Sequence, residues 1–267
     1  MGDRYRIEDG SKFRLSDIDP ADTGKFSSKE DAAAKQAKDI AQLSVLHDKL
    51  YVDGRHALLV ILQGMDTSGK DGTIRHVFTG LNPQGCHVTS FKKPSPEELA
   101  HDFLWRINKA LPERGTLGIF NRSQYEDVLA VRVHNLVPKD VWSNRYEEIN
   151  HFEQRLANEG TTILKFFLYI SKGEQAKRIR ARVDDPAKRW KFTQADMTER
   201  RYWKDYLKAH QDAIRECSTP WAPWCVVPSN HKWYRNYVVA NAIVKALSKL
   251  DLKLPKTHID PAVLKQL

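Results

Sequence analysis

Apolar residues occur along this chain in short runs that are separated by polar and charged segments. Residues 57–62 (Ala-Leu-Leu-Val-Ile-Leu) are continuously apolar, which is typical of a strand buried on both faces of a parallel sheet. Comparable strand signals lie at 86–91, 115–121, 161–170 and 224–227. No apolar run approaches the ~20 residues that span a bilayer, so we expect no membrane partner.

Helical periodicity fills the segments between these strands. Ser28 is expected to cap a first helix, and Gly160 to follow a long helix over 142–159. The remaining helices are expected at 95–111, from Ser123, and at 174–183, 196–217 and 233–250, with a charged break at 184–193. Strands that alternate with helices of this length predict an α/β fold with a doubly wound parallel sheet.

Length and composition limit the organisation of the chain. Residues 1–30 are polar and weakly periodic, so we expect an extended N-terminal arm before a single domain over 31–267. The start of the chain lacks the apolar segment of a secretory signal. Three cysteines without CxxC spacing indicate neither a disulfide framework nor a zinc site. These features predict a cytoplasmic protein.

A formal net charge of +9 predicts an anionic partner: nucleic acid, a membrane surface, or a phosphate-rich small molecule or polymer. Between Lys177 and Lys204 there are ten Lys or Arg and only four Asp or Glu. Arg178 and Arg182 are four residues apart and share a helix face. We therefore predict a basic lid at about 177–205 that closes over a phosphoryl group, although a charge run is more often a solvated surface.

The motif that decides the chemistry is Gly64-Met65-Asp66-Thr67-Ser68-Gly69-Lys70, which fits G-x-x-x-x-G-K. It follows the apolar strand and precedes a helical stretch, the context in which loop N–H groups hold phosphate and the lysine neutralises it. Asp71 stands where Ser or Thr is usual, and we interpret it as an acid at a helix N-terminus. Asp66 is a candidate Mg²⁺ ligand, or a base that orients an attacking phosphate.

A second group of polar residues follows the strand at 115–121, at the sheet edge where open α/β sheets bind ligands. Asn121 ends this strand, at a place where many phosphate-loop enzymes carry an acid. Arg122 is placed to hold a phosphate, and Glu126 is expected to face the site. Asp127 is equally well explained as a site residue or as a helix-start acid paired with Arg132.

Five stretches resemble the polyphosphate kinase 2 family. They are GMDTSGKD at 64–71, HDFLWR at 101–106, FNRSQYEDV at 120–128, INHFE at 149–153 and DPAKRWK at 185–191. The resemblance covers roughly residues 30 to 250. It implies a thymidylate-kinase-like P-loop core, a three-layer α/β/α arrangement with a helical lid, Mg²⁺ dependence, and reversible phosphoryl transfer between inorganic polyphosphate and nucleotides.

The resemblance also assigns roles by position. Asp66 and Lys70 resemble the essential loop pair of the family, and Arg122 and Arg182 its phosphate-binding arginines. Many members have Asp in place of Asn121, and Asn121 with Glu126 resembles the subclass that phosphorylates both nucleoside mono- and diphosphates, here AMP and ADP. Further phosphate or nucleotide contacts are expected from the loop residues Gly64, Met65, Thr67, Ser68, Gly69 and Asp71, and from Asn121 and Arg178. A polyphosphate channel is expected along Lys92, Lys93, Lys188, Arg189 and Lys191, in a homodimer or homotetramer, although Lys92 and Lys93 are equally well explained as a solvated pair.

Three other functions are compatible with parts of the sequence, and the weakest of them is a P-loop regulator that binds nucleotide without turning it over. An ATP-dependent nucleoside monophosphate kinase would share the fold but would not respond to polyphosphate. A non-catalytic nucleic-acid-binding protein would use the basic face and bind oligonucleotides in a salt-sensitive manner, but it would leave the phosphate loop without a role. We favour the polyphosphate-dependent enzyme, with no nucleic-acid partner.

Overall fold

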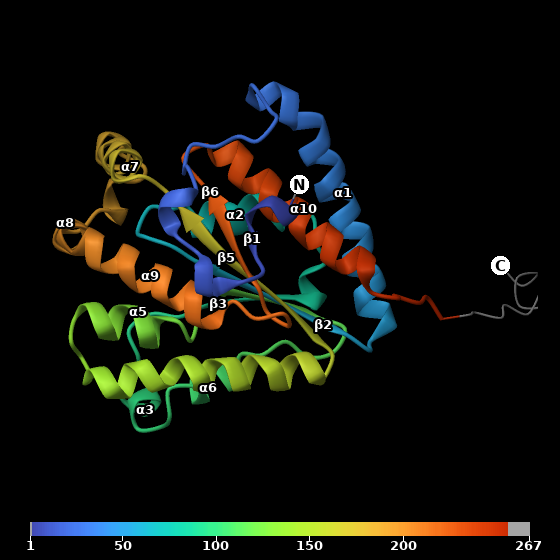
Figure 1. The fold of residues 1–267 in the computed structure, drawn as a ribbon. Coiled ribbons are helices and arrows are strands. Elements are labelled where there is room, and N and C mark those ends of the chain that lie inside the picture. The colour runs from blue at the N-terminus through green and yellow to red at the C-terminus, as the bar shows by residue number, and fades with distance from the viewer. Residues whose placement is uncertain (1, 256–267) are drawn as a thin grey trace, which may run out of the picture.

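The computed structural model describes residues 2–255 of the 267, so the end of the expected domain, 256–267, lies outside the described residues. A six-stranded sheet forms the middle of the molecule, in the order β1-β6-β5-β2-β4-β3 (Figure 1). Its strands are β1 (Arg6–Ile7), β2 (Ala57–Gln63), β3 (Cys86–Ser90), β4 (Leu117–Asn121), β5 (Thr161–Tyr169) and β6 (Trp224–Pro228). Strands β2 to β6 pair in parallel, as predicted, and β1 adds an unpredicted antiparallel edge against β6.

Helices cover both faces of this sheet, which gives the predicted three layers (Figure 1). One face carries α1 (Lys29–Asp53), α2 (Lys70–Val77) and α10 (Lys232–Lys249), and the other carries α4 (Trp105–Lys109), α5 (Glu126–Val133), α6 (Lys139–Asn158) and α9 (Trp203–Cys217). The side chains of β2 alternate between the two cores: Leu58, Val60 and Leu62 pack towards α1 and α10, and Leu59 and Ile61 towards α4 and α6. Each buried side chain of this size stabilises the fold by roughly 1.5–3 kcal/mol.

Capping residues set several helix ends, including the one predicted at Ser28. The Ser28 side chain accepts a hydrogen bond from the Asp31 N–H and begins α1, and Gly54 ends that helix in a left-handed conformation at φ 64°. Ser171 caps α7 (Lys172–Asp184) in the same way, through the N–H of Glu174.

Two predicted helices are interrupted. The helix expected at 95–111 is split into α3 (Pro96–Leu99) and α4, because the Asp102 side chain accepts a hydrogen bond from the Leu104 N–H at 3.0 Å and forms a turn between them. The helix expected at 196–217 is split into α8 (Gln194–Glu199), the 3₁₀ turn η6 (Arg200–Tyr202) and α9. Arg200 donates to the Lys172 carbonyl at 3.0 Å and to Gln175 at 2.6 Å, so a contact with α7 fixes this break.

The segment before α1 is built from short 3₁₀ turns, η1 (Gly2–Tyr5), η2 (Gly10–Lys12) and η3 (Leu15–Asp17), together with β1. Four apolar anchors, Tyr5, Phe13, Leu15 and Phe26, are buried in the two cores. The remaining turns are η4 (Pro83–Gly85) before β3 and η5 (Arg189–Lys191) after α7. The segment before α1 is therefore held against the sheet by its own side chains.

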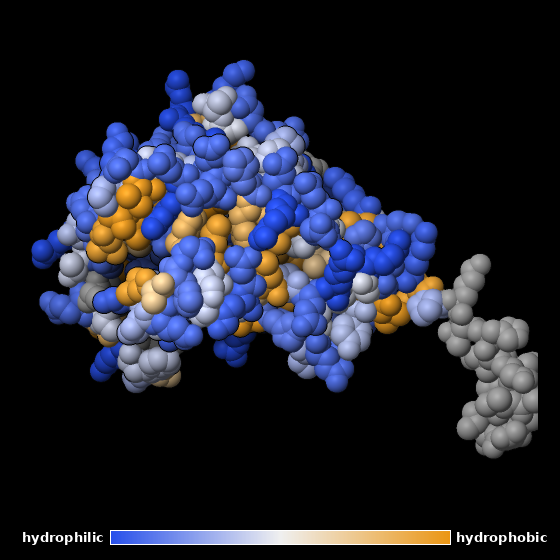
Figure 2. All heavy atoms as spheres, turned by 90° about the horizontal axis from the view of Figure 1, so that it is seen from below, coloured by the Kyte–Doolittle hydropathy of each residue, from blue (hydrophilic) through white to orange (hydrophobic). Residues whose placement is uncertain are grey.

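The basic segment predicted as a lid contains α7, η5 and α8, and α7 and α8 lie beyond the carboxyl ends of the strands (Figure 1). The face of the molecule in Figure 2 is mostly hydrophilic, with apolar side chains showing in patches between polar ones. Within residues 2–255, no helix is both long enough and apolar enough to cross a membrane.

Candidate functional site

The site is centred on the loop that joins β2 to α2. Strand β2 ends at Gln63, the loop follows, and α2 begins at Lys70. Because β2 pairs in parallel with both β4 and β5, the carboxyl ends of these three strands surround the loop. The chain winds in opposite directions on the two sides of β2, and ligands of open α/β sheets bind at such a switch point.

The backbone of the loop requires its glycines. Gly64 has φ 152° and Gly69 has φ 104°. A Cβ atom at Gly64 would lie 2.8 Å from the Leu168 carbonyl oxygen, and one at Gly69 would lie 1.9 Å from Nη1 of Arg235. Thr67 is also left-handed, at φ 64°, a conformation that costs roughly 1–3 kcal/mol in a non-glycine residue and is concentrated at functional sites.

Lys70 is positioned by the first turn of α2 and is 8% exposed. Its Nζ lies across the loop and donates a hydrogen bond to the Gly64 carbonyl at 2.7 Å. Burial and then the neighbouring charge of Arg122 lower the pKa of Lys70, while the carboxylates of Asp66 and Glu126 act in the opposite direction. The predicted phosphate lysine is thus held at the centre of the loop.

Asp66 and Arg122 are brought together from two strand ends. Arg122 Nη2 and Asp66 Oδ1 are 3.0 Å apart. Arg122 is held at φ 66°, which is unusual for a residue other than glycine. Burial lowers the pKa of Arg122, but the carboxylates of Glu126 and Asp66 outweigh that effect and raise it. Its charge is therefore held between two acids that face the same hollow.

That hollow has a volume of about 400 Å³. Its charged side contains the predicted residues Asp66, Arg122, Glu126, Lys92 and Lys93, together with Gly64 and Met65. Its apolar side comes from Phe91 and from Leu129, Ala130 and Val131 of α5. A charged floor beside an apolar wall suits a ligand that has a phosphate at one end and a flat apolar group at the other.

One rim of the hollow links α5 to the basic segment. Glu199, at the end of α8, lies 3.1 Å from His134 Nε2 and accepts a hydrogen bond from the Tyr206 hydroxyl at 2.9 Å. All three side chains line the hollow. The segment predicted as a lid therefore already contributes to the wall of the site.

Asn121 and Asp71 contact each other beside the loop. The Asn121 side-chain amide donates to Asp71 Oδ1 at 2.7 Å. Asp71 lies in the first turn of α2, which agrees with its interpretation as a helix-start acid. This pair connects the end of β4 to the start of α2.

Asp127 does not pair with Arg132, the partner considered from the sequence, but with two other arginines. It lies 3.6 Å from both Arg106 and Arg145, whereas Arg132 pairs with Asp212 at 2.8 Å. Burial raises the pKa of Asp127 to about 6, against the opposing effect of the two arginines. Asp127 therefore joins α5 to α4 and α6 at the edge of the hollow.

Arg178 was predicted to contact phosphate, and its role there stays a prediction. Each of its five N–H groups has a protein acceptor in this structure. The acceptors are Glu174 Oε1 at 2.8 Å and the carbonyls of Thr67 at 3.0 Å, Ser68 at 2.9 Å, Ser229 at 2.5 Å and Asn230 at 3.1 Å. The guanidinium thus holds the loop from the side of α7.

The other predicted basic residues lie further along the same segment. Arg182 is half-buried in the last turn of α7. Lys188 is exposed and pairs with Asp185, and Arg189 donates to the Val183 carbonyl at 2.8 Å. Lys191 lies in η5, and its side chain is outside the described part of the chain. Their contact with a polymer stays a prediction.

A buried ion pair supports the site and was missed from the sequence. Lys165 Nζ lies 2.5 Å from Glu153 Oε2, and both side chains are fully buried. Glu153 also accepts hydrogen bonds from the Tyr125 hydroxyl at 2.9 Å and from Gln124 at 3.0 Å. These bonds fix the segment between Arg122 and Glu126. The sequence signal for this ion pair was Lys165, a lysine inside the otherwise largely apolar strand β5.

Arg235 is the second residue that sequence reasoning missed. It lies in the first turns of α10, is 2% exposed, and donates to the Ser68 carbonyl at 3.2 Å. An arginine in a largely apolar helix was the only signal in the sequence. The sequence could not indicate its contact with Ser68, because only the fold brings α10 next to the loop.

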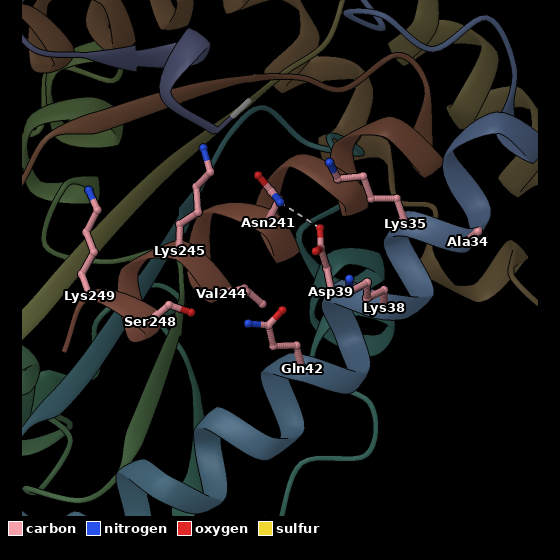
Figure 3. Close-up of a pocket in the computed structure, with 10 residues that line it drawn as sticks. All are labelled: Ala34, Lys35, Lys38, Asp39, Gln42, Asn241, Val244, Lys245, Ser248 and Lys249. Carbon is pink, nitrogen blue, oxygen red and sulfur yellow. Dashed lines mark hydrogen bonds between the residues drawn. The ribbon is translucent and has the colours of Figure 1, made fainter. Parts of the chain in front are cut away.

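A hollow of about 740 Å³ lies apart from the loop, between α1 and α10 (Figure 3). Lys35, Lys38, Lys245 and Lys249 surround it, and Asn241 donates to Asp39 at 2.9 Å within it. It shares no residue with the predicted site. We therefore place the chemistry at the loop.

Comparison with known proteins agrees with this geometry. The model of the family "Polyphosphate kinase 2" matches residues 26–255. An AMP/ADP-polyphosphate phosphotransferase of Meiothermus ruber is 50% identical over 254 residues, which cover 95% of each chain. An ADP-polyphosphate phosphotransferase of Rhodopseudomonas palustris is 44% identical over 92% of each chain. The crystal structure of polyphosphate kinase 2 from Arthrobacter aurescens TC1 superposes with a TM-score of 0.93, at 46% identity, over 97% of this chain and 94% of that one.

Proposed function

The chain belongs to the polyphosphate kinase 2 family, and from this premise we propose that it transfers phosphoryl groups from inorganic polyphosphate to AMP and ADP, giving ADP and ATP in a reversible reaction. The observation that carries the proposal is the hollow at the loop. It combines the phosphate loop, Asp66, Arg122 and Glu126 with an apolar wall of the kind that an adenine ring would contact.

The transfer needs positioning and charge neutralisation more than covalent help from the protein. The terminal P–O bond of the polymer breaks, and a new P–O bond forms to a phosphate oxygen of the nucleotide. That oxygen is already ionised at neutral pH, so no general base is required. Lys70 and Arg122 would neutralise the oxygens of the transferring group, and Glu126 would hold Arg122 in place.

We infer that the reaction depends on Mg²⁺, with Asp66 as its protein ligand. Mg²⁺ commonly binds through one or two carboxylates together with substrate phosphates and water. Among the described residues no cluster of three or more Asp, Glu, His or Cys could hold a metal alone, and the donor set fits an ion shared with the substrate. Once bound, Mg²⁺ would offset negative charge on the phosphates.

The segment at about 177–205 would act as the lid of a single kinase domain over 31–267. Arg182 would reach the transferring phosphate, and Lys92, Lys93, Lys188, Arg189 and Lys191 would guide the polymer towards the loop. A polymer with about one negative charge per phosphate needs positive charge along its whole path.

We further propose that the protein works in the cytoplasm, where adenine nucleotides are available, and as a homodimer or homotetramer. Light scattering of the purified protein tests the second statement. A monomer at all concentrations would contradict it.

The experiment that tests the proposed function supplies the purified protein with Mg²⁺, ADP and polyphosphate and measures ATP. We expect ATP from wild type and none from Lys70→Ala, whose circular dichroism spectrum should match wild type. If ATP is the only phosphoryl donor that the enzyme accepts, with AMP as acceptor, the protein is a nucleoside monophosphate kinase instead.

A further inference from the structure

Two arginines from distant parts of the chain meet beneath the phosphate loop. Arg178 comes from α7 and Arg235 from α10. Both donate to one carbonyl oxygen, that of Ser68, at 2.9 Å and 3.2 Å. Neither residue faces the hollow where the predicted site residues gather, since neither lines it.

Arg235 is buried with little compensation for its charge. Its other hydrogen bonds within the described residues go to the neutral side chain of Asn236, at 3.1 Å from Nε and 2.8 Å from Nη2. Burial and then the like charge of Arg178 lower the pKa of Arg235 to about 9, and no acid among residues 2–255 is paired with it. A buried cation without a paired anion destabilises a fold, and a second cation nearby adds to that cost.

The shared carbonyl fixes the orientation of the loop. In a trans peptide the C=O and the following N–H point in opposite directions. When the two guanidinium groups hold the Ser68 carbonyl on their side, the Gly69 N–H turns to the opposite side, at the start of α2. This is where a helix N-terminus presents its free N–H groups to an anion.

Gly69 and Arg235 are matched to each other. A Cβ atom at position 69 would overlap Nη1 of Arg235, at 1.9 Å, and one at Gly72 would lie 3.4 Å from Nη2. The glycine of the motif therefore makes room for a guanidinium below the loop, in addition to allowing a tight turn.

We propose that Arg178 and Arg235 are positioning residues of the phosphate loop, which hold the Ser68 carbonyl so that the adjacent N–H groups face a bound phosphate chain. Arg178 is paired with Glu174, whereas the positive charge of Arg235 is poorly compensated in the free protein and is compensated when polyphosphate lies on the loop. This inference rests on the proposed function, because it takes polyphosphate as the ligand of the loop.

A positioning role and a purely structural role of Arg235 predict different effects on stability and on ligand binding. If Arg235 only held the fold together, its removal would lower the stability of the free protein and leave ligand binding intact. If it positions the loop, its removal leaves the free protein as stable as wild type or more so, and the stabilisation by a phosphate chain is lost.

The test is thermal unfolding of wild type and Arg235→Met, with and without inorganic tripolyphosphate and Mg²⁺. We expect Arg235→Met to unfold at the wild-type temperature or above without ligand, and to lose at least half of the rise in Tm that tripolyphosphate gives wild type. Arg215→Met is the matched control, because Arg215 also donates to a main-chain carbonyl, that of Phe13 at 2.7 Å, but from α9. Arg215→Met should show the full wild-type rise in Tm with tripolyphosphate.

A lower Tm without ligand together with an undiminished rise would overturn the proposal. If Arg235→Met does not fold, Arg235→Lys replaces it: the charge stays, but the planar fork that spans the Ser68 carbonyl and Asn236 is lost. We expect this variant to lose part of the rise in Tm, and a full rise would count against the proposal.

Kinetics keep this inference distinct from the proposed function. With active wild type, we expect Arg235→Met to raise the KM for polyphosphate roughly tenfold and to change the KM for ADP much less, since ADP binds in the hollow. If Arg235→Met and wild type have equal KM values for polyphosphate, the positioning role of Arg235 is overturned and the proposed function is unaffected. If wild type forms no ATP but its tripolyphosphate binding still depends on Arg235, the proposed function fails and the positioning role stands.

Discussion

At the scale of single residues, the site depends on three acids, each of which has different neighbours. Asp66 faces the hollow and pairs with Arg122, whereas Asp71 is hydrogen-bonded to Asn121 at the start of α2. Asp127 is buried between Arg106 and Arg145. The same carboxylate group therefore has a different role at each position, and each role can be tested by a neutral substitution.

Asp66→Asn should lower kcat for ATP formation by at least roughly 100-fold, which corresponds to about 3 kcal/mol. The substitution keeps the shape of the side chain but removes the charge that we assign to Mg²⁺ binding and that pairs with Arg122. The matched control is Asp71→Asn, in the first turn of α2, for which we expect less than a tenfold change. The measurement is initial velocity at saturating ADP and polyphosphate. Turnover near the wild-type value in Asp66→Asn would remove the role that we assign to it.

His210 predicts a pH dependence of stability. It is 4% exposed, and burial followed by the nearby charge of Lys70 lowers its pKa to about 3. In the unfolded chain it titrates near 6.5, so as pH falls below that value the unfolded state gains a proton that the folded state refuses. The stability due to neutral His210 is thus complete above pH ~6.5 and is lost as pH falls towards 3.

His210→Gln should therefore reduce the loss of stability on acidification. Between pH 7 and pH 4 we expect the free energy of unfolding, measured in urea, to fall by about 3 kcal/mol less in the variant than in wild type. For each protein we compare the free energy of unfolding at pH 7 with that at pH 4. A loss of packing that is the same at both pH values therefore cancels. Parallel pH profiles would show that His210 is not the group responsible.

At the scale of elements, local sequence signals predicted what local forces determine. The apolar run of β2, the cap at Ser28 and the glycine-rich loop each carry their own physical cause, and each was found where it was expected. The breaks in two helices depend on particular hydrogen bonds. One of these, from Arg200 to α7, joins segments that only the folded chain brings together.

The substitution Lys188→Ala tests whether the basic segment at about 177–205 guides the polymer. Lys188 is exposed in the segment between α7 and η5, and it pairs only with Asp185 in the described contacts. An exposed charge acts through screened attraction, so we expect the KM for polyphosphate to rise a few-fold at low salt and less at high salt, with kcat unchanged. Lys35→Ala, on α1 beside the separate hollow of Figure 3, should leave both constants unchanged. An equal effect of the two substitutions would argue against a channel at Lys188.

At the scale of the whole molecule, the order of the strands assembles the site. The alternation of strands and helices predicted a parallel sheet, but the periodicity of short runs could not give the order β1-β6-β5-β2-β4-β3 or the antiparallel edge strand. The same limit applies to the residues beneath the loop. Lys70 and Asp66 were identified from a motif, whereas Arg235, Glu153 and Lys165 act through partners distant in the sequence, which only the fold reveals.

The central claim is that one site at the loop phosphorylates both AMP and ADP with polyphosphate as the donor. The most direct measurement incubates the purified protein with Mg²⁺, polyphosphate and AMP and follows the nucleotides by chromatography over time. We predict that ADP forms first and ATP follows from it, and that both reactions stop in Lys70→Ala. If AMP is not converted to ADP, or if ADP supplied directly is not converted to ATP, the claim is contradicted.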